Sequence, residues 1–203
     1  MKTVALHYHR HAERLARIYR DVSFDAVHAP LLKHLPRKGS RVIDIGAGAG
    51  RDAYALAELG YDLTAVEPSA KMRRVGQLGE EHSGRVTWVD DSLPALMRVR
   101  ATGEAFQFIL CSAVLMHLPA CLLGASFFAL RTIAEPAAAL AVTVRNLLPS
   151  DPPGIFHDHD RATIVGEAAT AGFALIEDGA NIDLFRRSDA NWSWFVFRAE
   201  PPA

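Results

Sequence analysis

Residues 42–60 read VIDIGAGAGRDAYALAELG, in which an apolar run precedes three alternating glycines and a helical pattern. The run at 41–45 predicts a buried strand, and residues 52–59 predict a helix that ends at Gly60. Glycines let the backbone turn sharply and approach a ligand closely, and the N-terminus of the following helix favours an anionic group. The stretch therefore predicts a ligand-binding unit built from a strand, a loop and a helix.

The rest of the chain alternates between short β-rich runs and longer helical patterns, which is typical of an α/β fold with a parallel sheet. We expect further strands at 62–66, 85–89, 106–111, 139–145, 173–176 and 191–198. We expect helices from Ser69 to about Glu81, about Leu93 to Arg100, Pro119 to Ala134, and Asp160 to Gly172. No helical pattern precedes the last strand, and a parallel neighbour needs a helical crossover, so this strand should run antiparallel.

A length of 203 residues suits one domain, with residues 1–38 as an N-terminal helical cap and 39–203 as the core. Apolar residues at helical spacing, interrupted by Pro30 and Pro36, predict two short helices in the cap. The loop from Asn146 to His159 is rich in Pro, Asp and His and is longer than most connections. Such loops are commonly lids or binding loops, and we expect the same here.

Charge and composition exclude several classes of protein. Lys and Arg total 22 against 23 for Asp and Glu, without a run of like charges, so we expect no nucleic-acid partner. Cys111 and Cys121 lack the spacing of thiolate metal sites. The N-terminus lacks the pattern of a secretory signal, and Pro119 interrupts the uncharged stretch 105–130, which we interpret as a strand and a helix. The sequence thus predicts a cytoplasmic protein with no membrane partner.

Four motifs, which follow one another along the chain, indicate which ligand the glycine loop binds. Dinucleotide-binding loops read GxGxxG or GxGxxA, and the sixth position here is Arg51, which is too large beside a pyrophosphate. Residues 44–50 instead read DxGxGxG, and AVEPS with Glu67, VDDSLP with Asp91 and FILCSAVLMHLP follow the next three strands. A Gly172-Phe173 pair precedes the sixth strand. Together these motifs resemble those of class I S-adenosylmethionine-dependent methyltransferases over most of residues 40–199.

The resemblance implies a doubly wound, Rossmann-like, seven-stranded sheet of order 3-2-1-4-5-7-6 with the last strand antiparallel. It implies methyl transfer from S-adenosyl-L-methionine, which leaves S-adenosyl-L-homocysteine. Glu67 would accept the ribose hydroxyls, Asp91 the adenine amino group, and the backbone near Ser112 would face the methionine part. The expected cofactor-binding residues are Asp44, Gly46, Ala47, Gly48, Gly50, Arg51, Glu67, Pro68, Asp91, Ser92, Leu93, Cys111 and Ser112. A helix N-cap is the alternative reading of Asp91 or Ser92.

Departures from other branches of this family point to a small-molecule acceptor. Nucleic-acid adenine and glutamine methyltransferases carry Asn/Asp-Pro-Pro-Tyr/Phe after strand four, where this chain reads CSAV. The similar string Asp151-Pro152-Pro153-Gly154 falls after strand five and lacks the aromatic residue. Cys111 follows Leu110 rather than proline, so it reads as a core thiol rather than a nucleophile. We expect a monomer or a homodimer.

A general base is needed only if the acceptor starts protonated, and His117 is our first candidate and His157 the second. Arg145, with Asn146, would orient the acceptor, and Tyr8, Tyr19 and Phe156 would close the pocket. We predict no metal site, because His7 with His11 and the segment 157–160 each lack a convincing ligand set. Two alternatives stay open: a non-catalytic module that binds S-adenosylmethionine, and an NAD(P)-dependent oxidoreductase.

Overall fold

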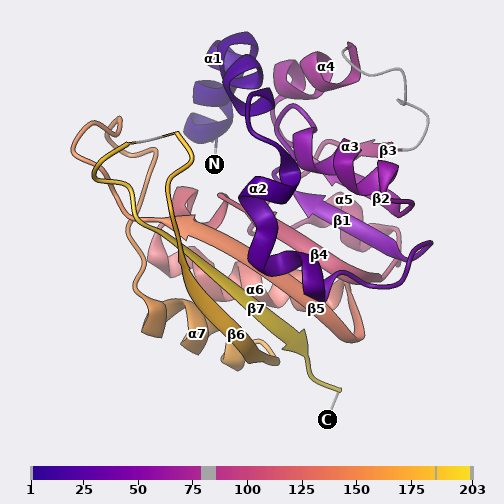
Figure 1. Cartoon of the computed structure of the whole chain (residues 1–203). Coiled ribbons are helices and arrows are strands. Elements are labelled where there is room, and N and C mark those ends of the chain that lie inside the picture. Colours follow the sequence, from indigo (N-terminus) through magenta and orange to yellow (C-terminus); the bar gives the residue numbers. More distant parts are fainter. Residues whose placement is uncertain (1, 79–85, 186, 202–203) are drawn as a thin grey trace.

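The computed structural model describes residues 2–78, 86–185 and 187–201, and its sheet has the order β3-β2-β1-β4-β5-β7-β6 (Figure 1). The strands are β1 Arg41–Ile45, β2 Asp62–Val66, β3 Val86–Val89, β4 Phe106–Ser112, β5 Ala134–Arg145, β6 Phe173–Asn181 and β7 Trp192–Ala199. Strands β1 to β5 pair in parallel, and β7 runs antiparallel to both β5 and β6. The expected strand order and the reversed last strand are confirmed.

Helices cover both faces of the sheet, and each face has its own apolar cluster. Helices α2 Phe24–His28 and α3 Arg51–Glu58 pack on one face with the 3-10 segment Ala29–His34. Helices α5 Met97–Ala101, α6 Leu123–Thr132 and α7 Arg161–Thr170 pack on the other. In β1, Val42 joins the first cluster whereas Ile43 and Ile45 join the second. Burial on both faces explains why β1 reads as a continuous apolar run.

The N-terminal cap differs from the prediction of two short helices, which was wrong. Helix α1 is one continuous element, Lys2–Arg20, and the short α2 and a 3-10 turn follow it. The prolines that interrupt the cap pattern, Pro30 and Pro36, lie beyond α1, so nothing in 2–20 stops the helix. Helix α1 lies beside α4 Ala70–Leu78, above the carboxyl ends of the central strands (Figure 1).

Several element boundaries also need correction. Helix α5 begins at Met97 rather than near Leu93, because the left-handed conformation of Leu96 interrupts helical geometry before Met97. Turns of 3-10 helix at Leu115–His117 and Ala120–Leu122 precede α6, and β5 already begins at Ala134. Strand β6 continues to Asn181 through a register shift. The predicted end of α4 at Glu81 and the start of β3 at Arg85 lie outside the described residues.

Asp160 accepts a hydrogen bond from the Thr163 backbone N–H at 2.7 Å and so caps α7 as predicted. Within residues 2–78, 86–185 and 187–201, no helix is both long enough and apolar enough to cross a bilayer.

Candidate functional site

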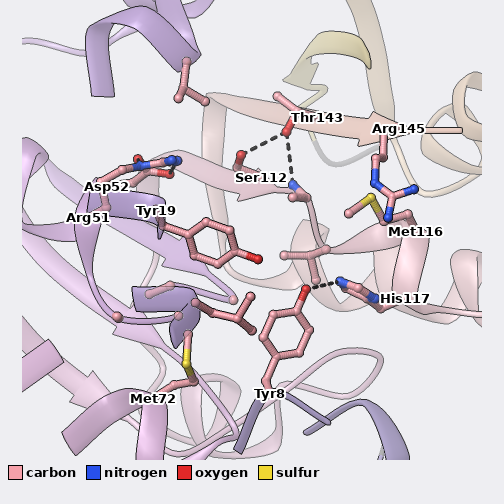
Figure 2. Close-up of a pocket in the computed structure, with 18 of the residues that line it drawn as sticks. Tyr8, Tyr19, Arg51, Asp52, Met72, Ser112, Met116, His117, Thr143 and Arg145 are labelled. Atoms are coloured by element: carbon pink, nitrogen blue, oxygen red, sulfur yellow. Dashed lines mark hydrogen bonds and ion pairs between the residues drawn. The ribbon is translucent and has the colours of Figure 1, made fainter. Parts of the chain in front are cut away.

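A cavity of about 630 Å³ opens at the carboxyl edge of the sheet. Its lining comes from the segments that follow β1 to β4, from the end of β5, from α1 and from the connection between β6 and β7. Figure 2 shows Tyr8 and Tyr19 of α1 reaching into this space opposite Ser112, Thr143 and His117. Open α/β sheets bind ligands at this edge, next to the strands where the chain reverses its direction of winding.

The glycine loop after β1 forms one wall of the cavity. Gly46 has φ +74°, and a Cβ placed there would lie 2.5 Å from Cγ2 of Val114. Gly46, Ala47 and Gly48 line the cavity, so the loop offers its backbone to a ligand. Gly50 does not line the cavity: a Cβ there would lie 2.6 Å from Cε2 of Tyr54, so packing within the fold requires this glycine.

Glu67, at the end of β2, presents a buried carboxylate to the cavity. Its Oε2 accepts a hydrogen bond from the Gly48 N–H at 3.0 Å, and its Oε1 accepts one from the Ser69 N–H at 2.7 Å. Burial raises the pKa of Glu67 to about 7, although both N–H donors oppose this rise. Each oxygen keeps a lone pair, so the carboxylate can still accept two ligand hydroxyls. Pro68 follows it in the lining.

Arg51, the first residue of α3, brings a cation into the cavity (Figure 2). Its Nε and Nη2 donate to the Asp52 carboxylate at 2.6 and 2.8 Å, and His28 Nε2 lies 3.0 Å from the same carboxylate. Burial opposes ionisation of Asp52, yet His28 and Arg51 hold its pKa well below the ordinary value. Nη1 of Arg51 makes no hydrogen bond to any residue that the structure describes, so it is available to an anionic ligand group.

Asp91, Ser92 and Leu93 line the cavity after β3. Oδ2 of Asp91 accepts hydrogen bonds from the backbone N–H groups of Arg98 at 2.7 Å and Val99 at 3.0 Å. Asp91 therefore satisfies two N–H groups in the first turn of α5, although the N-cap residue of that helix is Leu96. Its Oδ1 accepts only the Ser92 N–H at 2.8 Å among the described residues, so one lone pair remains for a ligand donor.

Besides Gly50, two predicted cofactor residues are absent from the cavity lining. Cys111 is fully buried in an apolar cluster, where burial raises the pKa of its thiol far above the usual range. Asp44 is also buried, and burial together with the nearby Asp52 raises its pKa well above the ordinary value. Ser112 does line the cavity, and its hydroxyl lies 2.9 Å from that of Thr143.

His117 lines the cavity from the 3-10 turn after β4. Its Nε2 lies 3.0 Å from the Tyr8 hydroxyl, and its Nδ1 lies 2.8 Å from the Ile155 carbonyl oxygen. Burial lowers the pKa of His117 to about 4, and the nearby Arg145 acts in the same direction. The imidazole is therefore neutral at pH 7.

Arg145 anchors the loop that follows β5. Its Nη1 and Nη2 donate to the Asp151 carboxylate at 2.7 and 2.6 Å, and its guanidinium carbon lies 4.3 Å from the ring centroid of Phe156. The guanidinium thus already has a buried carboxylate partner. Asn146 does not line the cavity, and it bonds to Asn191 and Asp189 near the start of β7.

His157 is not in the cavity lining, whereas its neighbour Phe156 is. The His157 backbone N–H donates to the Met116 carbonyl at 2.7 Å, and its ring stacks on that of His159. The structure does not bring this second base candidate to the cavity. Among the described residues, no group of three or more His, Cys, Asp or Glu side chains is arranged to hold a metal ion.

The β6–β7 connection forms a further wall of the cavity that was not predicted from the sequence. Asp183 accepts a hydrogen bond from Trp192 Nε1 at 2.9 Å and two more from Nε and Nη2 of Arg187. Burial raises the pKa of Asp183, but these donors lower it to about 2. Leu184 and Phe185 line the cavity, as do Met72 and Met116 elsewhere. The only sequence signal for this wall was the presence of apolar residues, such as Leu184 and Phe185, in a connection that shows no helical or strand periodicity.

A family model described as a methyltransferase domain matches residues 8–189. A ubiquinone biosynthesis O-methyltransferase of Ralstonia nicotianae is 28% identical over 155 residues, which are 68% of this chain and 62% of that protein. Another, of Xylella fastidiosa, is 34% identical over 88 residues, which are 43% of this chain and 35% of that protein. This chain therefore spans between about a third and two thirds of the length of these relatives.

Solved structures show the same fold at low sequence identity. The magnesium protoporphyrin IX methyltransferase of Synechocystis, with bound S-adenosylhomocysteine, has a TM-score of 0.74 at 20% identity, covering 98% of this chain and 100% of that one. The 1,6-didemethyltoxoflavin N1-methyltransferase of Burkholderia thailandensis has a TM-score of 0.75 at 18% identity, covering 98% and 89%. The cyclase SpnF also matches, with a TM-score of 0.71 at 13% identity over 90% and 85% of the two chains. Likeness at this level shows the fold alone.

Proposed function

Because the chain belongs to the family of methyltransferase domains, we propose that it transfers a methyl group from S-adenosylmethionine to a small, largely apolar acceptor. The observation that carries this proposal is the division of one cavity into two unlike halves. The cofactor half consists of Gly46–Ala49, Arg51, Glu67, Pro68 and Asp91–Leu93. The acceptor half includes Tyr8, Tyr19, Met116, His117, Phe156, Leu184, Phe185 and Trp192, and the charged residues that also line it, Arg145, Asp183 and Arg187, are held in ion pairs.

The cofactor half offers groups that match the parts of S-adenosylmethionine. The Glu67 carboxylate can accept both ribose hydroxyls, and Nη1 of Arg51 can bind the methionine carboxylate. The glycine loop offers its backbone to the ligand, since Gly46, Ala47 and Gly48 line the cavity and the positive φ of Gly46 and Gly48 favours glycine at both positions. The free lone pair of Asp91 Oδ1 suits an amino donor. These residues fit the cofactor, which when bound supplies an already activated methyl group.

The acceptor half fits a flat, apolar molecule of modest size. Its aromatic side chains surround the remaining space, and the whole cavity of about 630 Å³ is within the usual range for small-molecule sites. The names of the matched relatives and structures, which mention ubiquinone biosynthesis, a porphyrin and toxoflavin, support a ring-shaped small molecule as acceptor. A site of this kind must align the acceptor with the methyl carbon and exclude water.

The non-catalytic alternative is less well supported, because a site that only binds the cofactor has no need for a second half lined by aromatic side chains and a neutral imidazole. The oxidoreductase alternative is disfavoured by Arg51, whose ion pair with Asp52 occupies the place where a dinucleotide-binding loop keeps a small residue.

The test is to incubate the protein with S-adenosylmethionine carrying a deuterated methyl group and a panel of small hydroxylated and aminated aromatic molecules. Mass spectrometry should find at least one product heavier by a deuterated methyl group, together with S-adenosylhomocysteine. A Glu67→Ala variant serves as the control, because it lacks the proposed ribose acceptor. Binding of S-adenosylmethionine without any labelled product across the panel would favour the non-catalytic alternative.

A further inference from the structure

Tyr8 and His117 are 109 positions apart in the sequence, yet their polar atoms meet in the cavity at 3.0 Å (Figure 2). The Ile155 carbonyl oxygen, 2.8 Å from His117 Nδ1, can only accept a hydrogen bond. Nδ1 must therefore carry the imidazole proton, which makes Nε2 an acceptor. It follows that the Tyr8 hydroxyl donates its proton to Nε2.

These hydrogen bonds all donate in one direction, from the Tyr8 hydroxyl in the cavity to His117 and from His117 to the Ile155 carbonyl. The Tyr8 oxygen uses its proton toward His117 and keeps its lone pairs, and Tyr8 lines the cavity. Figure 2 shows the hydroxyl groups of Tyr8 and Tyr19 pointing toward the same space. His117 is only 7% exposed, and Nε2 is already occupied by Tyr8. A proton from the acceptor would thus reach His117 through Tyr8.

The loop after β5 fixes this arrangement. Ile155 is held in place by its neighbour Phe156, which lies under the Arg145 guanidinium, and by the fork between Arg145 and Asp151. The Phe156 ring also packs against the His117 imidazole, with centroids 4.6 Å apart. The carbonyl that selects the His117 tautomer therefore belongs to a segment anchored by a buried ion pair.

We propose that Tyr8 and His117 form a proton relay for an acceptor that carries an aromatic hydroxyl group, an inference that rests on the proposed methyltransferase function. The acceptor O–H bond breaks and its proton passes to the Tyr8 oxygen, while the Tyr8 proton passes to His117 Nε2. The acceptor oxygen bonds to the methyl carbon as the carbon–sulfur bond breaks and leaves its electron pair on sulfur. After the product leaves, Nε2 returns this proton to the Tyr8 oxygen as Tyr8 releases its own proton to water in the cavity. Tyr8 is the catalytic residue, and His117 acts through it.

Burial and the neighbouring charged groups keep both Tyr8 and His117 neutral before the reaction. Burial raises the pKa of Tyr8 well above its ordinary value, with the adjacent Tyr19 and Glu67 adding to the rise, so Tyr8 stays protonated. Around His117, Arg145 of β5 and His7 of α1 disfavour the imidazolium, whereas Asp151 favours it. Because the imidazolium is disfavoured, the proton should move together with the methyl group rather than before it.

The first test uses the protein alone. Nitrogen-15 NMR of the histidine side chains should show His117 as the Nδ1–H tautomer at pH 7, and Tyr8→Phe should shift its Nε2 resonance because the donor is lost. Tyr61→Phe is the matched control, since the Tyr61 hydroxyl donates to the Pro36 carbonyl and does not line the cavity. An Nε2–H tautomer of His117 in the unaltered protein would overturn the proposal.

The second test compares catechol with 4-nitrocatechol, whose more acidic hydroxyl is largely ionised without help. Tyr8→Phe should slow catechol methylation about 100-fold at pH 7 and leave 4-nitrocatechol methylation nearly unchanged. The loss with catechol should shrink as the pH rises and catechol ionises by itself, while the affinity for S-adenosylhomocysteine stays the same. Tyr61→Phe should behave like the unaltered protein.

Equal slowing of both phenols would show that Tyr8 only shapes the site and would overturn the relay. Unaltered protein that binds S-adenosylhomocysteine but methylates neither phenol would overturn the hydroxyl acceptor. Failure to bind S-adenosylhomocysteine would instead count against the proposed function itself.

Discussion

The two halves of the cavity are built by different means. The cofactor half uses residues that directly follow β1, β2 and β3, so the parallel sheet itself sets their positions. The acceptor half gathers side chains from α1, from the turn after β4, from the loop after β5 and from the β6–β7 connection. We therefore expect cofactor binding to depend on the core of the fold, and acceptor recognition to depend on contacts between distant segments.

The largest expected effect is a loss of stability in Asp151→Ala that leaves cofactor binding unchanged. Asp151→Ala would leave the buried Arg145 without its carboxylate partner, so we expect the free energy of unfolding to fall by about 3 to 5 kcal/mol. Denaturant unfolding measures this loss, and calorimetry on the folded variant should find the affinity for S-adenosylhomocysteine unchanged. Asp178→Ala is the control, because its fork to Arg161 lies at the surface and should matter far less. A loss of cofactor affinity in folded Asp151→Ala would contradict the claim that the cofactor half does not depend on the loop after β5.

Glu67→Gln tests the cofactor half alone. The amide keeps the size of the carboxylate but removes the charge and sets an N–H group against a backbone donor of Gly48 or Ser69. Cofactor affinity should fall by about 1.5 to 3 kcal/mol, the range for hydrogen bonds to charged groups. Calorimetric titration with S-adenosylhomocysteine measures it. Unchanged affinity in a folded variant would remove Glu67 from the ribose site.

Gly46→Ala tests whether the glycine loop acts through its backbone. A side chain at φ +74° is strained by about 1–3 kcal/mol, and its Cβ would also lie 2.5 Å from Val114. Gly39→Ala is a close control, since Gly39 has φ +83° and nothing within 4 Å of the added Cβ. Both variants should unfold at lower denaturant concentration, but only Gly46→Ala should bind the cofactor more weakly. Equal cofactor affinity in the two would contradict a backbone role for Gly46.

The smallest expected effect is a pH dependence that only the cofactor half should show. Burial raises the pKa of Glu67 to about 7, and ribose hydroxyls donate to the ionised form, so binding favours the carboxylate. Affinity for S-adenosylhomocysteine should therefore be level above pH 8 and fall roughly tenfold by pH 6, as the carboxylate gains a proton. In Glu67→Gln the same titration should be flat. Weaker binding at higher pH would contradict the assignment.

The division between the halves also explains what could be predicted from the sequence. The strand that ends at Ile45, the glycines after it and the acid at Glu67 are local patterns, because a buried parallel strand and a tight turn each restrict residue type. The succession of these patterns carried the resemblance to the family, the resemblance implied the sheet order, and both the family and the order are confirmed. The roles assigned to individual cofactor residues stay predictions.

The acceptor half could be predicted only in part, because its geometry depends on contacts that no local pattern encodes. Tyr8 and His117 were each singled out, but their hydrogen bond depends on how α1 sits over the sheet. Arg145 was assigned to the acceptor, and it does line the cavity, but its ion pair with Asp151 was not predicted, because the loop returns this carboxylate to the strand end six positions later. The predicted strand β6 ended too early, because the apolar pattern stops before Glu177 and Asp178. These two residues form ion pairs with Lys33 and Arg161 instead of packing in an apolar core.

Calorimetric titration of the unaltered protein with S-adenosylhomocysteine, and separately with NAD, tests the central claim most directly. The arrangement of Glu67, Arg51 and the glycine loop predicts saturable binding of S-adenosylhomocysteine with one site per chain and no heat of binding with NAD. Tight binding of NAD together with no response to S-adenosylhomocysteine would contradict it.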